Sequence, residues 1–586
     1  GLDFDIKYQY GKQQTTSRNL YNLETFFARD LINGFTNLTQ TNSSLRNPVP
    51  IGGILIQGLG TYTSQNFRAQ INFVHTWNKK HNLNGIVGTD VGKGSTLSNS
   101  YGYYGYNDAL GSNIAVDYVN NYPNYITGNN SRIQNHGNIN GFYSRTVSVY
   151  ANAAYTYKNR YTVFGSARRD GSNIFGATTN NKWKPLWSAG VKWDIDSEPF
   201  YKISWLTDFN FRATYGYQGN VNNIVAAALT TISAGSSLNR WRLPYSLIQN
   251  YPNPNLRWEN IAQFNIGVDF KIKNNIWGSI EYYRKKGTDL IGDQSLPPSS
   301  GVSSTKTNTA DIKGKGIDIS INTRINLGPI NWTASFLFGY AKDWVSNYKS
   351  SLTNILNYVG GGTNPIVGKP VSALYSYRWA GLDPLTGDPQ GYIAGQLSKN
   401  YAQLVSSTNL SDMVYEGPQI PPYFGSILNT FRWKGLTLSA TINYKFGYYF
   451  RRSSINYSNL ISKIDRGHTD YTQRWQKPGD EQFTNVPSFI YPPDNNRDIF
   501  YTRSQILTVK GDHIRLQDIR LSYDINKQKF RKVPFQNIQL YVTISNLGIL
   551  WRANEFGIDP DYARSSFNYT NGLPGKSIVA GLVTNF

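Results

Sequence analysis

Side chains able to carry out bond chemistry are few and scattered in this sequence. It contains no Cys, so thiol nucleophiles, disulfides and thiolate zinc sites are excluded. The five histidines, His75, His81, His136, His468 and His513, show no H-E-x-x-H or other ligand spacing. No G-x-S-x-G motif supplies a serine nucleophile. We therefore expect no catalytic residues, no metal site and no cofactor, and we predict that the protein is not an enzyme.

Two short motifs match ligand-binding loops only in part. Residues 91–95, VGKGS, are rich in glycine, but a phosphate-binding loop needs an earlier Gly and a following helix. Asp383 and Asp388, in DPLTGDP, offer oxygen ligands for Ca²⁺, but not in the order of an EF-hand. Asp-Pro and Thr-Gly-Asp are common turn sequences. We therefore predict a glycine-rich loop at the first motif and a turn at the second.

The elements that position these residues are strands, because apolar and polar residues alternate with a period of two. In residues 1–10, GLDFDIKYQY, every second side chain is apolar and the others are polar. The same alternation recurs in residues 208–217, 264–271, 436–446 and 578–586. Helical periodicity is nearly absent, and no stretch approaches the roughly 18 to 20 apolar residues of a membrane-spanning helix.

The connections between the strands alternate between short and long. We expect about sixteen strands of about ten residues. The short connections are expected at 78–81, 158–160, 196–206, 273–275, 326–329, 434–435 and 527–536. The long ones are expected at 11–66, 92–144, 218–258, 288–312, 342–421, 448–505 and 547–575, with a shorter one at 170–183. One rim of tight turns and one rim of large loops predict a transmembrane, up-and-down, antiparallel β-barrel in the outer membrane.

Soluble β-folds explain this pattern less well. A β-sandwich also alternates, but its loops show no such asymmetry, and a β-propeller would repeat every 40 to 50 residues or so. Strands of about ten residues suit a tilted crossing of the hydrocarbon layer. Aromatic residues near strand ends would form interfacial girdles, although ordinary packing explains any one of them equally well. They are Tyr8, Tyr10, Trp77, Trp193, Trp277, Trp332 and Trp433.

The formal charge of +22, from 58 Lys and Arg against 36 Asp and Glu, is spread over strands and turns. No RNP, zinc-finger or helix-turn-helix pattern accompanies it, so we predict no nucleic-acid partner. A barrel that lies in outer-membrane lipid beside anionic lipopolysaccharide, with a polar lumen, accounts for the excess.

Eight segments, in order, resemble the SusC/RagA family of TonB-dependent outer-membrane transporters of Bacteroidetes. Among them are YANAAYTYKNRYTVFGSARRDGSNIFG (150–176), WKPLWSAGVKWDIDSEPF (183–200), NPNLRWE (253–259) and RWAGLDPLTGDPQGY (378–392). The others are PPYFGSILNTFRWKGLTLS (421–439), HIRLQDIRLSYDI (513–525), SNLGILW (545–551) and KSIVAGLVTNF (576–586). The terminal Phe586 is similar to the aromatic residue that such barrels present to their assembly machinery.

The resemblance implies a barrel of 22 strands that holds an N-terminal plug, neither of which fits in this sequence. We therefore expect residues 1–586 to be the C-terminal part of one transmembrane β-barrel domain. The plug and the first strands would lie upstream or in a separate N-terminal polypeptide. A self-contained sixteen-strand pore is the structural alternative.

The resemblance also implies a function and partners. Substrate, an oligosaccharide or a peptide, would be captured under a SusD-like surface lipoprotein and imported by TonB–ExbB–ExbD acting through the missing N-terminal region. The alternatives are a passive sixteen-strand porin and a surface adhesin that transports nothing.

Aromatic side chains in the long loops suit stacking on sugars or packing on peptides, and polar neighbours could orient hydroxyls or carboxylates. Packing of the loops on one another and on the lid is the alternative for each residue. The predicted substrate-binding aromatics are Tyr101, Tyr103, Tyr104, Trp241, Tyr245, Tyr375, Trp379, Trp475, Tyr491 and Phe500. The predicted polar partners are Arg240, Arg242, Asn250, Asp383, Arg474 and Asp494. Loops 342–421 and 448–505 are the largest, so we expect them to make much of the lid contact.

Overall fold

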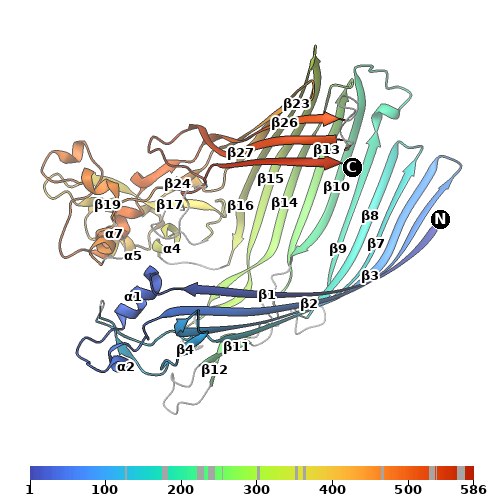
Figure 1. Cartoon of the computed structure of the whole chain (residues 1–586). Helices are drawn as coiled ribbons and strands as arrows, with labels where there is room; N and C mark the ends of the chain where they lie inside the picture. The colour runs from blue at the N-terminus through green and yellow to red at the C-terminus, as the bar shows by residue number, and fades with distance from the viewer. Residues whose placement is uncertain are drawn as a thin grey trace.

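The chain forms one large antiparallel sheet with long excursions at one end (Figure 1). This computed structural model describes residues 1–585 without 126–127, 174–182, 221–229, 235–244, 252, 254, 298, 300–303, 350–353, 361–363, 463–466, 527–534, 536 and 564–574. In the described part, the sheet has seventeen strands. Sixteen of them pair in chain order, each antiparallel to the next, and short β4 (Ser112–Ile114) pairs with β3.

The sixteen strands make up the wall of the molecule. They are β1 (Leu2–Tyr21), β2 (Gly53–Trp77), β3 (His81–Asn107), β7 (Asn138–Tyr157), β8 (Tyr161–Ser172), β9 (Trp183–Asp194), β10 (Leu206–Asn220), β13 (Glu259–Ile272), β14 (Ile276–Ser295), β15 (Ser304–Leu327), β16 (Ile330–Tyr348), β22 (Tyr423–Trp433), β23 (Leu436–Phe446), β26 (His513–Asn526), β27 (Asn537–Arg552) and β28 (Ser577–Asn585). The predicted all-β class and strand number are confirmed.

Smaller elements lie in the connections. The strands are β5 (Tyr122–Pro123), β6 (Asn130–Ser131), β11 (Thr230–Ala234), β12 (Tyr245–Asn250), β17 (Ala373–Tyr377), β18 (Trp379–Leu382), β19 (Pro389–Ile393), β20 (Gln396–Ser398), β21 (Met413–Pro418), β24 (Tyr449–Arg451) and β25 (Thr508–Lys510). The helices are α1 (Phe26–Gly34), α2 (Ser43–Arg46), α4 (Leu356–Val359), α5 (Tyr401–Ser406), α6 (Tyr457–Ile461) and α7 (Asn495–Thr502). Single 3₁₀ turns are η1 (Ile195–Ser197), η4 (Leu410–Asp412), η5 (Thr469–Gln473), η6 (Asp480–Gln482) and η7 (Gln505–Leu507). None of the helices in the described part is both long and apolar enough to span a bilayer.

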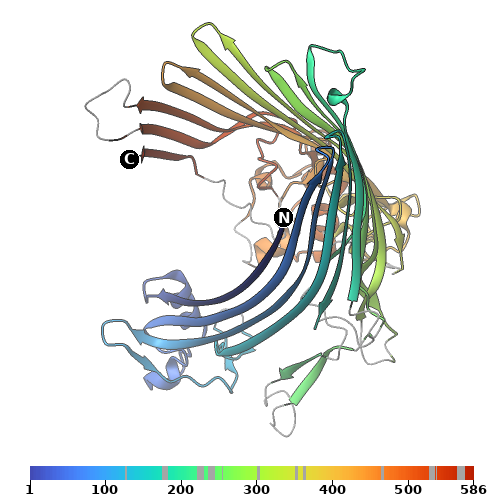
Figure 2. The same ribbon diagram turned by 90° about the vertical axis from the view of Figure 1, so that its right-hand side faces the viewer.

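The sheet curves around a hollow but is not closed (Figure 2). Among the described strands, β1 pairs only with β2, and β28 pairs only with β27, so these two strands are the edges. Both termini lie on the rim of short turns, as expected for an even number of crossings (Figure 1). An edge strand leaves a row of backbone N–H and C=O groups without ladder partners, which a bilayer cannot satisfy.

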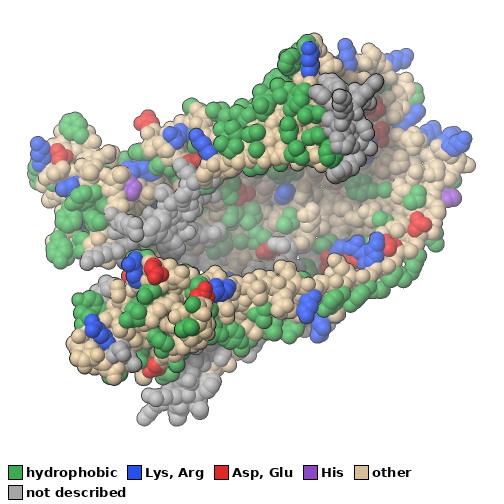
Figure 3. Space-filling view, in the orientation of Figure 1, with side chains coloured by type: hydrophobic (Ala, Val, Ile, Leu, Met, Phe, Trp, Pro, Cys, Tyr) green, Lys and Arg blue, Asp and Glu red, His purple; other side chains and the backbone are tan. Residues whose placement is uncertain are grey.

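Alternation along the strands separates an apolar outer face from a polar inner face. Leu2, Phe4 and Ile6 on β1 are exposed on the outer face, opposite Phe73, Ile71 and Ala69 of β2. Asp5 and Lys7 lie between them and point inward. The space-filling view shows hydrophobic side chains along the outside of the wall and mainly polar ones in the hollow (Figure 3). The predicted pattern of an apolar exterior and a polar interior is confirmed.

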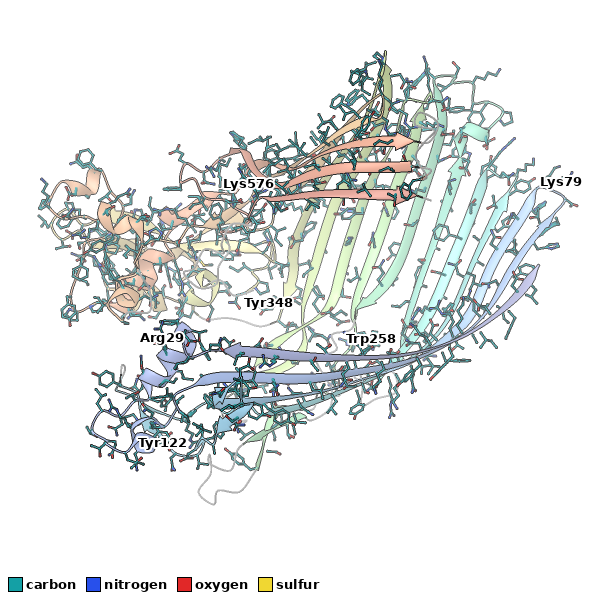
Figure 4. All side chains as sticks on the ribbon, viewed as in Figure 1. Arg29, Lys79, Tyr122, Trp258, Tyr348 and Lys576 are labelled. Carbon is teal, nitrogen blue, oxygen red and sulfur yellow. The ribbon has the colours of Figure 1, made fainter. Side chains whose placement is uncertain are left out.

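Tight turns join the strands at one rim. The turns after Trp77 and Tyr157 each contain two residues with positive φ, Asn78 and Lys79 in the first, and Lys158 and Asn159 in the second. Such left-handed residues match the twist of the two strands they connect. The described short connections agree with the predicted ones, whereas 527–536 lies almost entirely outside the described residues. Lys79 marks this rim in Figure 4, with Arg29 and Tyr122 at the other end of the molecule.

The predicted strand length of about ten residues is wrong for much of the wall. β3 has 27 residues and β2 has 25, because these strands continue as a paired ribbon beyond the membrane. Outside the bilayer both faces meet water, so segments such as 91–100, VGKGSTLSNS, lose the alternation that marks a strand in the sequence. The expected glycine-rich loop at 91–95 is therefore part of β3, and the excursions are shorter than predicted at 22–52 and 108–137.

Candidate functional site

The inner wall carries arginines paired with carboxylates. Arg68 on β2 donates to Asp90 on β3 at 2.6 Å, and Arg168 on β8 donates to Asp170 at 2.6 Å. Further around the wall, Arg212 on β10 lies 3.2 Å from Asp269 and also pairs with Glu281. Paired charges keep the wall hydrated without a large field of one sign. The inner wall therefore presents both signs of charge to the hollow.

Near the rim of tight turns, the inner wall contains a polar groove of about 590 Å³. Trp277 contributes to its lining beside Lys271 and Asp269, and the alternation of β14 places the Trp277 ring on the inner face. Trp277 therefore does not join a lipid-facing girdle, which was one of its two predicted roles. Trp193, by contrast, lies at the end of β9, and its indole N–H donates to Glu198 at 3.0 Å.

The excursions at the other rim fold into two units with their own cores. The described residues of 22–52 and 108–137 form the first loop module, with buried Ala28, Ile32 and Ile133 packed against Tyr104 at the end of β3. The described residues of 349–422 and 447–512 form the second loop module, with Phe500, fully buried, at its centre. Loop segments about a hundred residues apart in sequence thus depend on each other for burial.

In the second module, Tyr375, Trp379 and Phe500 pack inside the core. The Phe500 ring lies 6.4 Å from Trp379 and 5.5 Å from Tyr377. Tyr375 is buried beside Tyr358 and Tyr415, and the burial raises the pKa of its hydroxyl. The structure gives these predicted substrate-binding residues a packing role.

Trp475 and Asp383 stabilise one corner of the second module. The Trp475 ring covers Gly387 so closely that a Cβ there would overlap the ring, and the Gly387 φ of +68° also favours glycine. The Trp475 indole N–H donates to Glu481 at 3.1 Å. Asp383 accepts the backbone N–H of Leu385 at 2.8 Å, and its ion pair with Lys399 lowers the pKa of the carboxyl. This is the predicted turn.

Cations of the chain already neutralise the acidic pair of this turn. Lys399 lies 2.7 Å from Asp383, and Arg497 donates to Asp388 at 3.0 Å. The acidic pair therefore has its counterions within the chain. In the described part of the chain, no three His, Asp or Glu side chains are grouped so as to hold a metal.

The other predicted residues of the second module lie at the N-cap of helix α7 and in the loop before it. Asp494 caps it by accepting the N–H groups of Asn496 and Arg497 at 2.8 and 3.3 Å. Arg474 lies with its guanidinium 4.2 Å from the centre of the Tyr471 ring. Tyr491 is 76% exposed and is the predicted aromatic most open to a ligand in this module.

Next to the first module, the three predicted tyrosines lie on β3 rather than in a loop. Tyr104 is buried beside Tyr118 and His136 and donates to the Gln134 carbonyl at 2.7 Å; burial raises its pKa to about 12. Tyr101 and Tyr103 follow the outer-face alternation of β3, and Tyr101 is exposed. Both side chains therefore point away from the hollow.

The remaining predicted residues lie in the excursion between β10 and β13. Tyr245 and Asn250 belong to β12, which pairs with β11 through Ala234 opposite Tyr245 and Thr230 opposite Asn250. Arg240, Trp241 and Arg242 lie outside the described residues.

Sequence reasoning missed the polar groups that attach the loops to the wall. Buried His513 at the start of β26 lies 3.3 Å from Asp561, and Lys445 on β23 lies 2.7 Å from the same carboxylate. Arg515 pairs with Asp559 at 2.5 Å. In the second module, Arg451 donates to the Val359 carbonyl at 2.9 Å. The only trace of these contacts in the sequence is the Asp-Pro-Asp segment at residues 559–561, and such segments are common in loops of every kind.

Comparison with known proteins identifies the family. The model of the TonB dependent receptor-like β-barrel family matches residues 1–547. The chain belongs to this family. It therefore lies in the outer membrane, and its resemblance to SusC/RagA transporters is confirmed by its relatives.

Among curated relatives of this TonB-dependent receptor family member, receptor P39 of Formosa agariphila is 24% identical over 85% of the chain and 50% of its own length. SusC of Bacteroides thetaiotaomicron is 27% identical over 35% of the chain and 21% of its own length. The chain thus spans about half the length of P39. Among solved structures, the RagAB peptide importer in its closed-closed state matches with a TM-score of 0.77 at 20% identity. The match covers all of the present chain and 60% of the chain in the solved structure. This match shows a shared fold.

Proposed function

We propose that the intact protein imports oligosaccharides or peptides across the outer membrane by TonB-dependent transport. The main support is a wall that is apolar outside and lined with paired charges inside, in a chain of the TonB-dependent receptor family. Such a wall would line part of a route for polar solutes, and no bond chemistry is needed for transport.

We infer that other strands complete this wall. The edges β1 and β28 lie apart in Figure 2, with unpaired backbone toward the gap. Additional N-terminal strands and a plug, in a longer chain or in a separate polypeptide, would satisfy these edges and occlude the hollow. The match to only half the length of P39 supports this inference.

The proposed partners follow from the same arrangement. TonB–ExbB–ExbD would act on the N-terminal part, and a SusD-like lipoprotein would cover the loop modules. Phe483, 89% exposed, and Leu385 give the second module an apolar surface for that lid. Tyr491 remains a predicted cargo contact because it is exposed, and Arg240, Trp241 and Arg242 remain predictions.

Uptake measurements test the proposal directly. Cells that carry the intact protein receive labelled oligosaccharides or labelled peptides, with and without a protonophore. We expect saturable uptake of one of the two classes, which stops when the proton gradient is collapsed. Uptake that continues without the gradient, together with a steady open-channel current in a planar bilayer, would show a passive porin instead.

A further inference from the structure

A row of basic side chains crosses three neighbouring strands of the wall. Cross-strand pairing places Arg284 on β14 directly opposite Lys315 on β15, and Lys315 directly opposite Lys342 on β16. In the next row towards the long loops, Lys286 lies opposite Lys313. We refer to these five residues as the basic patch.

The basic patch lies on the lipid-facing side of the wall. The row immediately nearer the tight turns consists of Tyr282, Ile317 and Tyr340, and the row before it of Ile280, Ile319 and Phe338. Ile280 and Ile317 are exposed on the outer face. Because side chains two residues apart share a face, the five cations continue these apolar rows. The outer face therefore changes from apolar to basic at the same level on three strands.

The chain itself does not neutralise these cations. Like charges placed directly opposite each other destabilise a sheet, so three adjacent cations carry an energetic cost. Of the neighbouring acidic side chains, Glu281 pairs with Arg212 and Asp289 with Arg257. Asp318 on β15 and Asp343 on β16 alternate to the inner face of the wall, away from the patch. Within the described residues, none of the five cations lies within ion-pair distance of a carboxylate. An anion from outside the chain would remove the repulsion.

The position in the membrane indicates which anion is available. The patch lies on the long-loop side of the apolar rows, where the headgroups of the outer leaflet begin. Trp344, opposite Lys313, and the tyrosines of the adjacent row are side chains that favour this interface. Acyl chains would then lie along the apolar rows, and phosphate groups would meet Lys and Arg donors.

We propose that the basic patch binds the phosphate groups of a phosphorylated glycolipid of the outer leaflet. Arg284, Lys315 and Lys342 hold one phosphate row, and Lys286 and Lys313 extend the site toward the sugar backbone. This site depends only on the outer-membrane location and not on the cargo or on TonB.

Lipid binding to the purified intact protein in detergent tests the proposal, with bisphosphorylated lipid A as the probe and native mass spectrometry as the readout. The double variant Lys315→Gln/Lys342→Gln should weaken binding about thirtyfold, at about 1 kcal/mol for each cation. The control Lys80→Gln/Lys202→Gln removes two exposed lysines at the tight-turn rim and should leave binding unchanged. Equal binding by the test variant and the native protein would overturn the site.

Two further arms separate the lipid sources and the structural explanation. Dephosphorylated lipid A and phosphatidylglycerol should bind much more weakly; equal binding of either would overturn the glycolipid assignment. Lys315→Glu would pair with Arg284 and Lys342, so its unfolding temperature in lipid-free detergent should not fall while its lipid A affinity does. A lower unfolding temperature with unchanged lipid A affinity would contradict the proposal.

Discussion

At the scale of single residues, buried ion pairs decide how the loops are held. Arg497 is 1% exposed and donates to Asp388 at 3.0 Å and to the Ser488 carbonyl at 2.9 Å. It thereby joins helix α7 to the turn that precedes β19. Lys399 makes a similar contact with Asp383 at 2.7 Å, but its side chain is 39% exposed. The two cations offer a matched comparison of a buried and an exposed pair.

We predict that Arg497→Met destabilises the second loop module by about 1–3 kcal/mol, because it removes the donor to buried Ser488 and one cation from half-buried Asp388. Lys399→Met should cost at most about 1 kcal/mol. Limited proteolysis of the intact protein, with cleavage rates followed within residues 349–422 and 447–512, measures both. Equal cleavage of the two variants would contradict the role assigned to Arg497.

Asp561 should make the attachment of its loop to the wall depend on pH. Burial raises the pKa of this carboxyl, but hydrogen bonds from His513 and Lys445 outweigh burial and hold the pKa well below its usual range. The resulting stability is fully present above the unfolded pKa of about 3.9 and is lost as the pH falls toward the folded pKa. A spin label at Glu555→Cys should therefore be immobilised at neutral pH and become mobile only below about pH 4.

Asp561→Asn is the control for this titration and should leave the label mobile at neutral pH. A transition in the native loop well above about pH 4 would contradict the role assigned to Asp561.

The predicted substrate residues show what the sequence allows at this scale. Phe500 and Trp475 were selected as loop aromatics, and the same property that suits them for stacking lets them form a core with Trp379 and Gly387. No local pattern separates the two roles, because the core joins β17 to α7 across more than a hundred residues. Burial by distant partners is not readable from one segment.

At the scale of elements, the outer wall was predictable and the loop modules were not. The alternation of apolar and polar residues predicted which side chains of β1, β13 and β23 point outward. One face of the sheet meets lipid and the other meets water, so the two sets of side chains differ in polarity. The extended parts of β2 and β3 escaped prediction because both of their faces are hydrated. Strand geometry also depends on close contacts that a sequence does not mark, such as those of Gly316 on β15.

We predict that Gly316→Ala destabilises the barrel by about 1–3 kcal/mol. A Cβ at this position would overlap the hydroxyl of Tyr283 and the carbonyl oxygen of Tyr340, so the ring or the strand must move. Gly314→Ala is the matched control on the same strand and face, where the nearest atom would lie at 3.6 Å. The temperature at which the folded form disappears on a denaturing gel measures both, and equal temperatures would contradict the close packing.

At the scale of the whole molecule, an open sheet of sixteen wall strands with two folded loop modules is the C-terminal part of a barrel in our account. The charged inner wall, the apolar exterior and the unpaired edges β1 and β28 belong to one arrangement. A self-contained pore would instead require β1 and β28 to pair with each other. The two arrangements therefore differ in the distance between β1 and β28.

Electron–electron distances between spin labels at Tyr8→Cys on β1 and Leu582→Cys on β28 measure it, in the protein isolated from outer membranes. Both side chains face outward, and the absence of native Cys makes the labels specific. If six further strands separate these edges, the labels should lie about 35 Å apart, given about 4.8 Å between tilted neighbours. A distance below about 15 Å would show β1 paired with β28 and contradict the account.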